Sequence, residues 1–175
     1  MSVVANAEID TTTVTVSSNS TLSGTGRFDA ASGNFIVING TLQVGDSTLG
    51  STVASQLEIA TAGAGSTVMG STSTVLIDLF TNIGDNTAIL ASADRIKLFG
   101  TMNPTLGSTL VIGNPNSLTG FNDGDKWRIF DLSGGGSIAD TFNLDYSSLG
   151  PLSPGLSGYF NPGTGIFMIT SAVPE

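Results

Sequence analysis

Phe35-Ile36-Val37-Ile38-Asn39-Gly40-Thr41-Leu42-Gln43-Val44 is the stretch on which the choice of fold depends. It holds two short runs of strand-favouring residues, separated by the dipeptide Asn39-Gly40. Asn-Gly between two such runs is the strongest short-range signal for a β-hairpin, because both residues accept the positive φ angles of a two-residue turn. Taken alone, the stretch predicts neighbouring antiparallel strands and therefore an antiparallel β-sandwich.

The spacing of similar runs along the chain favours a different fold. Each run has an apolar residue near its centre, and these markers recur about every 17 to 18 residues: Leu22, Leu42, Leu57, Leu76, Ile96, Leu110 and Trp127. A sandwich usually shows turn signals every ~8–12 residues, whereas the longer repeat suits the stacked coils of a parallel β-helix. We therefore expect an all-β, right-handed parallel β-helix (solenoid) with C-terminal capping strands, and keep the antiparallel β-sandwich as the alternative.

Length and composition set the domain organisation. The chain has 175 residues, which fits a single domain. Residues 1–133 carry the repeating runs, and we expect them to form the β-helix coils. Residues 134–175 begin with three glycines, continue through a proline-rich loop and hold several aromatic residues, so we expect them to form the C-terminal cap and tail.

Missing residue types exclude several kinds of chemistry. The chain has neither cysteine nor histidine, which rules out disulfides, structural zinc sites built from these residues and histidine-based triads. The net charge is −9, with only five basic residues, too few to neutralise the phosphates of a nucleic acid. The longest apolar runs are far shorter than the ~20 residues of a spanning helix. We expect no nucleic-acid partner, no membrane insertion by this chain, and neither a signal peptide nor a membrane tail within it.

An ordered set of short motifs resembles a known family. The motifs are Asn19-Ser-Thr-Leu-Ser-Gly-Thr-Gly26, Ile38-Asn-Gly-Thr-Leu-Gln-Val-Gly45, Ser73-Thr-Val-Leu-Ile-Asp-Leu79, Ala93-Asp-Arg-Ile-Lys-Leu-Phe-Gly100 and Asp123-Gly-Asp-Lys-Trp-Arg-Ile-Phe130. Their residues and their order are similar to those of motifs at the C-terminal end of bacterial autotransporter-associated β-strand repeat proteins. The closing Val173-Pro174-Glu175 is similar to the start of a PEP-CTERM sorting signal, whose fourth residue, apolar segment and Arg-rich tail do not follow.

This resemblance implies a cellular location and a kind of partner. It implies an exported β-helical protein of the bacterial surface or extracellular matrix, with Val173, Pro174 and Glu175 as the remnant of a sorting signal. The partners would be the chain itself, other surface proteins or exopolysaccharide. The location would be extracellular or at the cell surface.

The densest acidic stretch, Asn122-Asp123-Gly124-Asp125, is the candidate for a metal site. Carboxylate and carbonyl oxygens are the ligands that Ca²⁺ takes, so Asp123 and Asp125 are weak calcium candidates and Ca²⁺ the one possible cofactor. The alternative is a β-turn in which the Asp side chains accept nearby backbone N–H groups. Gly-Asp recurs about every 40 residues, at Gly45-Asp46, Gly84-Asp85 and Gly124-Asp125, and this recurrence favours a repeated turn.

The remaining acidic and aromatic residues give no catalytic constellation. Paired carboxylates can cleave glycosidic bonds, but the acidic residues are scattered along the sequence. Asp78 lies in an apolar run, where burial would raise its pKa; strand alternation instead places it with Leu76 on an outer face. The same alternation places Arg95, Lys97 and Phe99 together on an outer face. Trp127, Tyr146 and Tyr159 are candidates for sugar stacking, and we expect Trp127 to belong to the core.

These observations favour a function without catalysis. We expect a non-enzymatic structural module of a secreted or cell-surface bacterial protein, for example a building block for matrix, adhesion or filaments, with no catalytic residues. The alternative is a carbohydrate-binding or polysaccharide-cleaving β-helix module.

Overall fold

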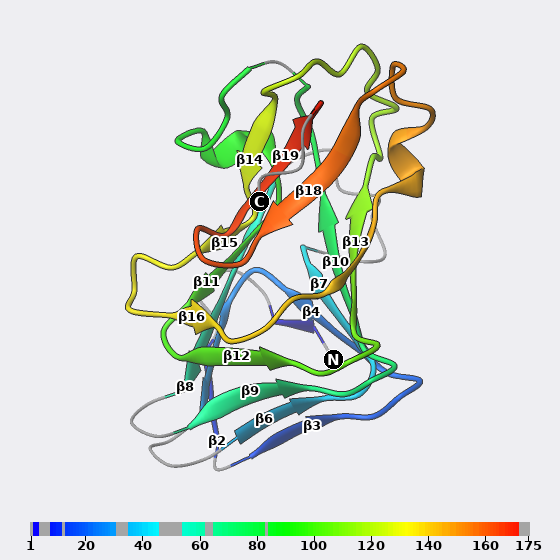
Figure 1. Cartoon of the computed structure of the whole chain (residues 1–175). Helices are drawn as coiled ribbons and strands as arrows, with labels where there is room; N and C mark the ends of the chain where they lie inside the picture. The colour runs from blue at the N-terminus through cyan, green and yellow to red at the C-terminus, as the bar shows by residue number, and fades with distance from the viewer. Residues whose placement is uncertain are drawn as a thin grey trace.

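The chain forms a parallel β-solenoid that carries a small antiparallel cap sheet (Figure 1). A computed structural model describes residues 2–3, 8–11, 13–30, 35–45, 54–61, 65–82 and 84–171. Each circuit of the solenoid contributes one strand to each of three parallel sheets, here named A, B and C. In Figure 1, sheet C lies at the bottom, sheets A and B rise from it, and the cap sheet lies at the top.

The strands of each sheet are neighbours in space and distant in sequence. Sheet A contains β1 (Ser2–Val3), β4 (Thr21–Gly24), β7 (Thr41–Val44), β10 (Thr74–Asp78), β13 (Thr109–Gly113) and β17 (Asn143–Asp145). Sheet B contains β2 (Glu8–Thr11), β5 (Arg27–Ala30), β8 (Gln56–Thr61), β11 (Arg95–Leu98) and β15 (Phe130–Asp131). Sheet C contains β3 (Val14–Val16), β6 (Phe35–Ile38), β9 (Ser66–Met69), β12 (Thr101–Pro104) and β16 (Ser137–Ile138). The expected parallel β-helix is confirmed.

The Asn39-Gly40 dipeptide is a corner of the solenoid and not a hairpin turn. It joins β6 in sheet C to β7 in sheet A, and these two strands do not pair. The backbone N–H groups of Asn39 and Thr41 bond to the carbonyls of Val16 and Ser20 in the preceding circuit, at 2.8 and 2.9 Å. A Cβ on Gly40 would lie 2.2 Å from the Ser20 carbonyl oxygen. Glycine is therefore required by the close stacking of two corners, and the antiparallel sandwich is wrong.

The repeat length expected from the marker residues is also wrong. In sheet A, Thr21 pairs with Thr41, Thr41 with Thr74, and Thr74 with Thr109, so successive circuits are 20, 33 and 35 residues long. The markers mixed residues of different sheets, because Leu42 lies in sheet A and Leu57 in sheet B. The average marker spacing of 17 to 18 residues therefore does not correspond to the length of any circuit.

Inward side chains form ladders that run along the solenoid. In sheet A one ladder is Leu22, Leu42, Val75 and Leu110, each at most 1% exposed. In sheet B, Phe28 stacks on Ile59, and Ile59 on Leu98. Burial of one such side chain stabilises a fold by about 1.5–3 kcal/mol. These ladders hold the circuits in register, because a one-residue slip of a strand would turn its inward side chains to the outer face.

The cap sheet interleaves with the solenoid along the chain. It contains β14 (Lys126–Arg128), β19 (Ile166–Thr170) and β18 (Ser157–Asn161) in that order, all antiparallel. β14 precedes the expected boundary at residues 133 and 134, whereas β16 and β17 follow it and complete the solenoid. The chain changes sheets at Ile129, because β14 pairs in the cap and β15, one residue later, pairs with β11.

Aromatic side chains join the cap to the last circuit. Phe160 of the cap sheet packs on Phe130 and Phe142, with ring centroids 5.6 and 6.2 Å apart. The expected C-terminal capping strands are confirmed. Within the described residues the only helices are single 3₁₀ turns, η1 (Leu90–Ser92) and η2 (Ser147–Leu149), and none of them has the length or apolar character to cross a membrane.

Candidate functional site

Asp125, one of the two calcium candidates, is a buried structural acceptor. Its side chain is 3% exposed. One carboxylate oxygen accepts the Gly84 N–H and the other accepts the Asn122 N–H, both at 2.8 Å. The carboxylate therefore joins the turn at 122–125 to a loop that is about 40 residues away in sequence, and the turn interpretation of Asp125 is confirmed.

Asp123 is exposed and binds a different segment. Its two oxygens accept the backbone N–H and the hydroxyl of Ser171, each at 2.9 Å. These hydrogen bonds lower the pKa of Asp123. Ca²⁺ takes about 6–8 oxygen ligands, whereas every oxygen of Asp123 and Asp125 already accepts a donor from the chain. Among the described residues no group of three or more acidic side chains is placed to hold a metal ion, and calcium binding by Asp123 and Asp125 stays a prediction.

Two of the three Gly-Asp dipeptides, Gly84-Asp85 and Gly124-Asp125, lie in loops that bond to one another. The Lys126 N–H bonds to the Gly84 carbonyl at 3.1 Å, and the Asn86 N–H bonds to the Lys126 carbonyl at 2.9 Å. The Lys126 ammonium lies 3.0 Å from the Asp85 carboxylate. Gly84 and Gly124 both have positive φ angles, +64° and +91°, as such turns require. The third occurrence ends in Asp46, which lies outside the described residues.

We expect Asp125→Asn to lower the free energy of unfolding by about 2 kcal/mol. The amide keeps one acceptor oxygen, but its NH₂ group faces a backbone N–H and leaves that donor unsatisfied, which costs about 1–3 kcal/mol when buried. Chemical denaturation measures the change. Asp140→Asn, at an exposed loop position, is the matched control and should change stability little. A rise in melting temperature with millimolar Ca²⁺ that Asp125→Asn abolishes would contradict the structural role.

Asp78 and Asp94 form a carboxylate pair that the sequence did not indicate. Asp78 ends β10, and Asp94 immediately precedes β11. Asp94 is 3% exposed and accepts the N–H groups of Ser55 and Asp78 at 2.8 and 3.4 Å, while its own N–H bonds to the Asp78 carbonyl at 2.8 Å. Burial raises the pKa of Asp94 to about 7, and the Asp78 carboxylate adds to this rise. The corner loop folds back on itself to bring together two residues that the sequence separates by 16 positions.

Asp94 is the buried member of the pair. A general acid or base must come within hydrogen-bond reach of its substrate, and at 3% exposure Asp94 presents almost no surface to one. Asp78 is half-buried on the outer face of sheet A beside Leu76, as strand alternation predicted. Burial raises the pKa of Asp78 as well. Asp94 therefore titrates inside the corner between sheets A and B, whereas Asp78 titrates on the outer face of sheet A.

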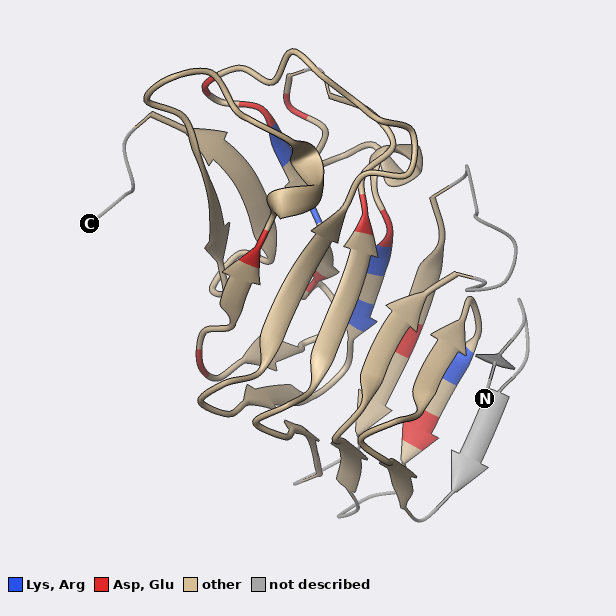
Figure 2. Cartoon of the chain, turned by 90° about the vertical axis from the view of Figure 1, so that its right-hand side faces the viewer, with Lys and Arg blue, Asp and Glu red and all other residues tan. Residues whose placement is uncertain are grey.

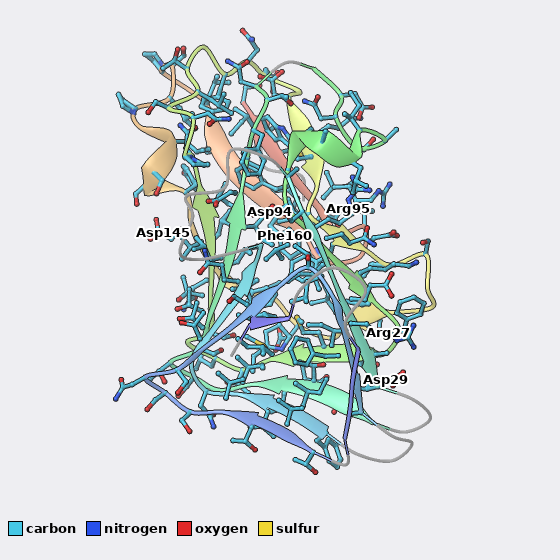
Figure 3. All side chains as sticks on the ribbon, turned by 180° about the vertical axis from the view of Figure 1, so that it is seen from behind. Arg27, Asp29, Asp94, Arg95, Asp145 and Phe160 are labelled. Atoms are coloured by element: carbon cyan, nitrogen blue, oxygen red, sulfur yellow. The ribbon has the colours of Figure 1, made fainter. Side chains whose placement is uncertain are left out.

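The strands of sheet B carry red and blue segments (Figure 2), and their charged side chains form a network of ion pairs. Arg27 lies beside Asp29 on β5 (Figure 3), with 2.8 Å between a guanidinium nitrogen and a carboxylate oxygen. Glu58 accepts ion pairs from Arg27 at 3.6 Å and from Lys97 at 3.5 Å. Both cations also lie over the Phe99 ring, 5.0 and 4.8 Å from its centroid. Exposed pairs of this kind contribute about 0–1 kcal/mol each to the free energy of unfolding. The network therefore adds little to the stability of the fold.

Arg95 is buried, although alternation placed it on an exposed outer face. It begins β11 next to Asp94 (Figure 3) and is 8% exposed. Its Nε donates to the carbonyl of Arg128, the last residue of β14, at 3.2 Å. One terminal guanidinium nitrogen is buried without a hydrogen-bond partner. Burial lowers the pKa of Arg95, and the Asp131 carboxylate opposes this effect.

The candidate sugar-stacking residues divide into one core residue and two at the surface. Trp127 is fully buried, its indole N–H donates to the Thr81 carbonyl at 2.7 Å, and its ring packs against Phe121 and Phe167. The core assignment of Trp127 is confirmed. Tyr146 and Tyr159 are half-buried.

One shallow hollow lies beside Tyr146. It has a volume of about 290 Å³, and Leu144, Asp145, Tyr146 and Ser147 line it. Asp145 accepts the Ser147 N–H at 2.9 Å, and this hydrogen bond lowers its pKa. A single carboxylate with a lowered pKa is a poor general acid, so the hollow offers an aromatic surface without a catalytic pair.

Comparison with known proteins adds no assignment. No protein-family model matches the chain, and no curated protein matches it. The resemblance to autotransporter-associated repeats therefore stays a prediction. Val173, Pro174 and Glu175 lie outside the described residues, so their reading as a sorting-signal remnant also stays a prediction.

Proposed function

We propose that the chain is a non-enzymatic structural module of a secreted or cell-surface bacterial protein. In this role the stacked circuits form a stiff spacer, and the cap sheet closes the last circuit. The secreted or surface location rests on the resemblance of the sequence motifs, and the mechanical role rests on the fold.

One observation carries the structural part of this proposal. The charged side chains that are buried in the described part of the chain are Asp94, Arg95 and Asp125, and each of them bonds to the backbone. Functional sites are where pKa values are perturbed and groups face a cleft, whereas these three groups join segments of chain to one another. Within the described residues, the buried charged groups thus join the corners and the cap to neighbouring segments of the chain.

The proposal predicts labelling of intact cells and inertness toward polysaccharides. Antibodies raised against the purified chain should label the surface or matrix of intact cells of the source organism, with a cytoplasmic marker protein as the control. The purified chain should release no reducing ends from neutral or acidic polysaccharides.

The polysaccharide arm also tests the carbohydrate-active alternative. Tyr146→Ala removes the aromatic ring of the hollow and Asp145→Asn removes its carboxylate charge, so they are the matched variants, with circular dichroism to verify the fold of Tyr146→Ala, whose ring packs against the core. Release of reducing ends by the wild-type chain, lost in Asp145→Asn, would replace the structural proposal with an enzymatic one. Retention on a polysaccharide that Tyr146→Ala abolishes would replace it with a binding module.

A further inference from the structure

Charge is distributed unevenly around the solenoid. The outer face of sheet B carries Arg27, Asp29, Glu58, Lys97 and Asp131. By contrast, none of the residues in β3, β6, β9, β12 and β16 is Asp, Glu, Lys or Arg. Figure 2 shows the strands of sheet C without a red or blue segment. In a chain of net charge −9, this sheet is a broad surface free of charge.

The outward residues of sheet C form two rows in register, here named the sheet C face. One row is Thr15, Val37, Val68 and Asn103, and the other is Phe35, Ser66, Thr101 and Ser137. All of these residues are exposed or half-exposed, and Phe35 is 46% exposed. Parallel sheets are usually covered on both faces, whereas this one leaves Phe35, Val37 and Val68 in contact with solvent.

We propose that the sheet C face binds the sheet C face of a second copy of this chain. Two copies with a charge of −9 each repel one another, and the repulsion is smallest where neither surface carries charge. Sheets pack face to face about 10 Å apart, a distance at which Phe35, Val37 and Val68 of both copies become covered. The hydroxyls of Thr101 and Ser137, 3.1 Å apart, lie at the end of the second row, where they stay hydrated.

The size of the face sets the expected strength of this contact. Five strands spaced about 4.8 Å apart, two to four residues long, give a surface of at most roughly 300 Å². Stable complexes bury about 800 Å² per partner. We therefore expect a weak dimer, which forms at high protein concentration or when copies are held close together on one surface.

The contact also limits the assembly to two copies. Because the same patch serves both partners, the interface is isologous and closes on itself. The assembly should therefore stop at the dimer. This inference goes beyond the proposed function and does not depend on it, because the charge distribution is a property of the fold.

Analytical ultracentrifugation from micromolar to millimolar concentration tests the inference. The wild-type chain should pass from monomer to dimer. Val68→Lys places a charge from each copy in the centre of the interface and should weaken dimerisation at least about tenfold. Ser137→Glu places a charge from each copy at its hydrated edge and should weaken dimerisation less. Ser137 is exposed, so this variant should keep the fold, which circular dichroism verifies. Gln56→Lys adds the same charge as Val68→Lys on the outer face of sheet B and should dimerise like the wild type.

Three outcomes would overturn the inference. They are a wild-type chain that stays monomeric at millimolar concentration, oligomers that grow beyond the dimer, and dimerisation that Val68→Lys and Ser137→Glu leave unchanged. A strict monomer would leave the proposed structural function untouched, because that function is tested by cell labelling and polysaccharide assays. A monomer that binds a neutral polysaccharide and loses this binding in Ser137→Glu would assign the face to a glycan instead.

Discussion

Trp127→Ala is expected to lower the free energy of unfolding by about 3–5 kcal/mol, the range for removing a large buried aromatic side chain. Trp127 is fully buried, lies in β14 and contacts Phe121 and Phe167. The substitution leaves a large cavity and removes the hydrogen bond to the Thr81 carbonyl. The loss falls where the cap sheet meets a corner loop of the solenoid, so the cap should open before the circuits separate.

Chemical denaturation and hydrogen exchange measure these two parts of the prediction. Amides of β18 and β19 should exchange faster in Trp127→Ala, while those of β7 and β10 keep their protection. Trp127→Phe restores most of the ring volume without the indole N–H, and we expect it to cost about half as much. Equal stability of wild type and Trp127→Ala, or uniform loss of protection, would show that Trp127 does not hold the cap.

The second large effect is a fall in stability between pH 4 and pH 7 that depends on Asp94. The pKa of Asp94 is about 7 in the folded chain, against an ordinary value of 3.8. Between these values the folded chain keeps a proton that the unfolded chain has released, so the free energy of unfolding falls as pH rises. At 1.36 kcal/mol per pH unit, this difference of about three units sets an upper limit of about 4 kcal/mol. Below pH 4 and above pH 7 this contribution no longer changes.

Asp94→Asn tests the assignment because the amide does not titrate. The variant should show a flatter profile from pH 4 to pH 7, and its amide NH₂ group, which faces a backbone N–H as in Asp125→Asn, should lower its stability by a similar amount at every pH. Asp145→Asn is the control: the pKa of Asp145 is lowered in the fold, so it stabilises the chain above its ordinary pKa and loses this contribution only as pH falls below about 4. A wild-type profile that stays flat from pH 4 to pH 7 would refute the buried, protonated state of Asp94.

The solenoid was predictable because its inward residues repeat, but the path of the chain at its corners was not. Asn39-Gly40 suits a hairpin and a corner equally well on local grounds. The choice depends on the carbonyls of Val16 and Ser20, which come from an earlier circuit. The uneven circuits, from 20 to 35 residues, likewise depend on how much chain each corner holds.

The candidate site was likewise predictable only in part. Local sequence correctly indicated that Asp125 belongs to a turn, since an Asp beside glycine accepts neighbouring N–H groups. It did not indicate that Asp125 also binds Gly84, or that Asp94 meets Asp78. No sequence spacing reports such contacts, because the loops that close them differ in length from one circuit to the next. The burial of Arg95 was missed for a related reason, since the carbonyl that accepts its Nε–H belongs to β14, a strand that pairs with the cap sheet near the end of the chain.

The sequence by itself determined an all-β chain without cysteine or histidine, stacked circuits with an aliphatic interior, and an aromatic cap near the C-terminus. These features follow from residue type and alternation, which act over a few residues. Only the tertiary structure decided which strands share a sheet, which carboxylates become buried, and which side of the solenoid is free of charge. Those outcomes depend on contacts between residues 16 to 48 positions apart, which form only when the circuits and their corners fold together.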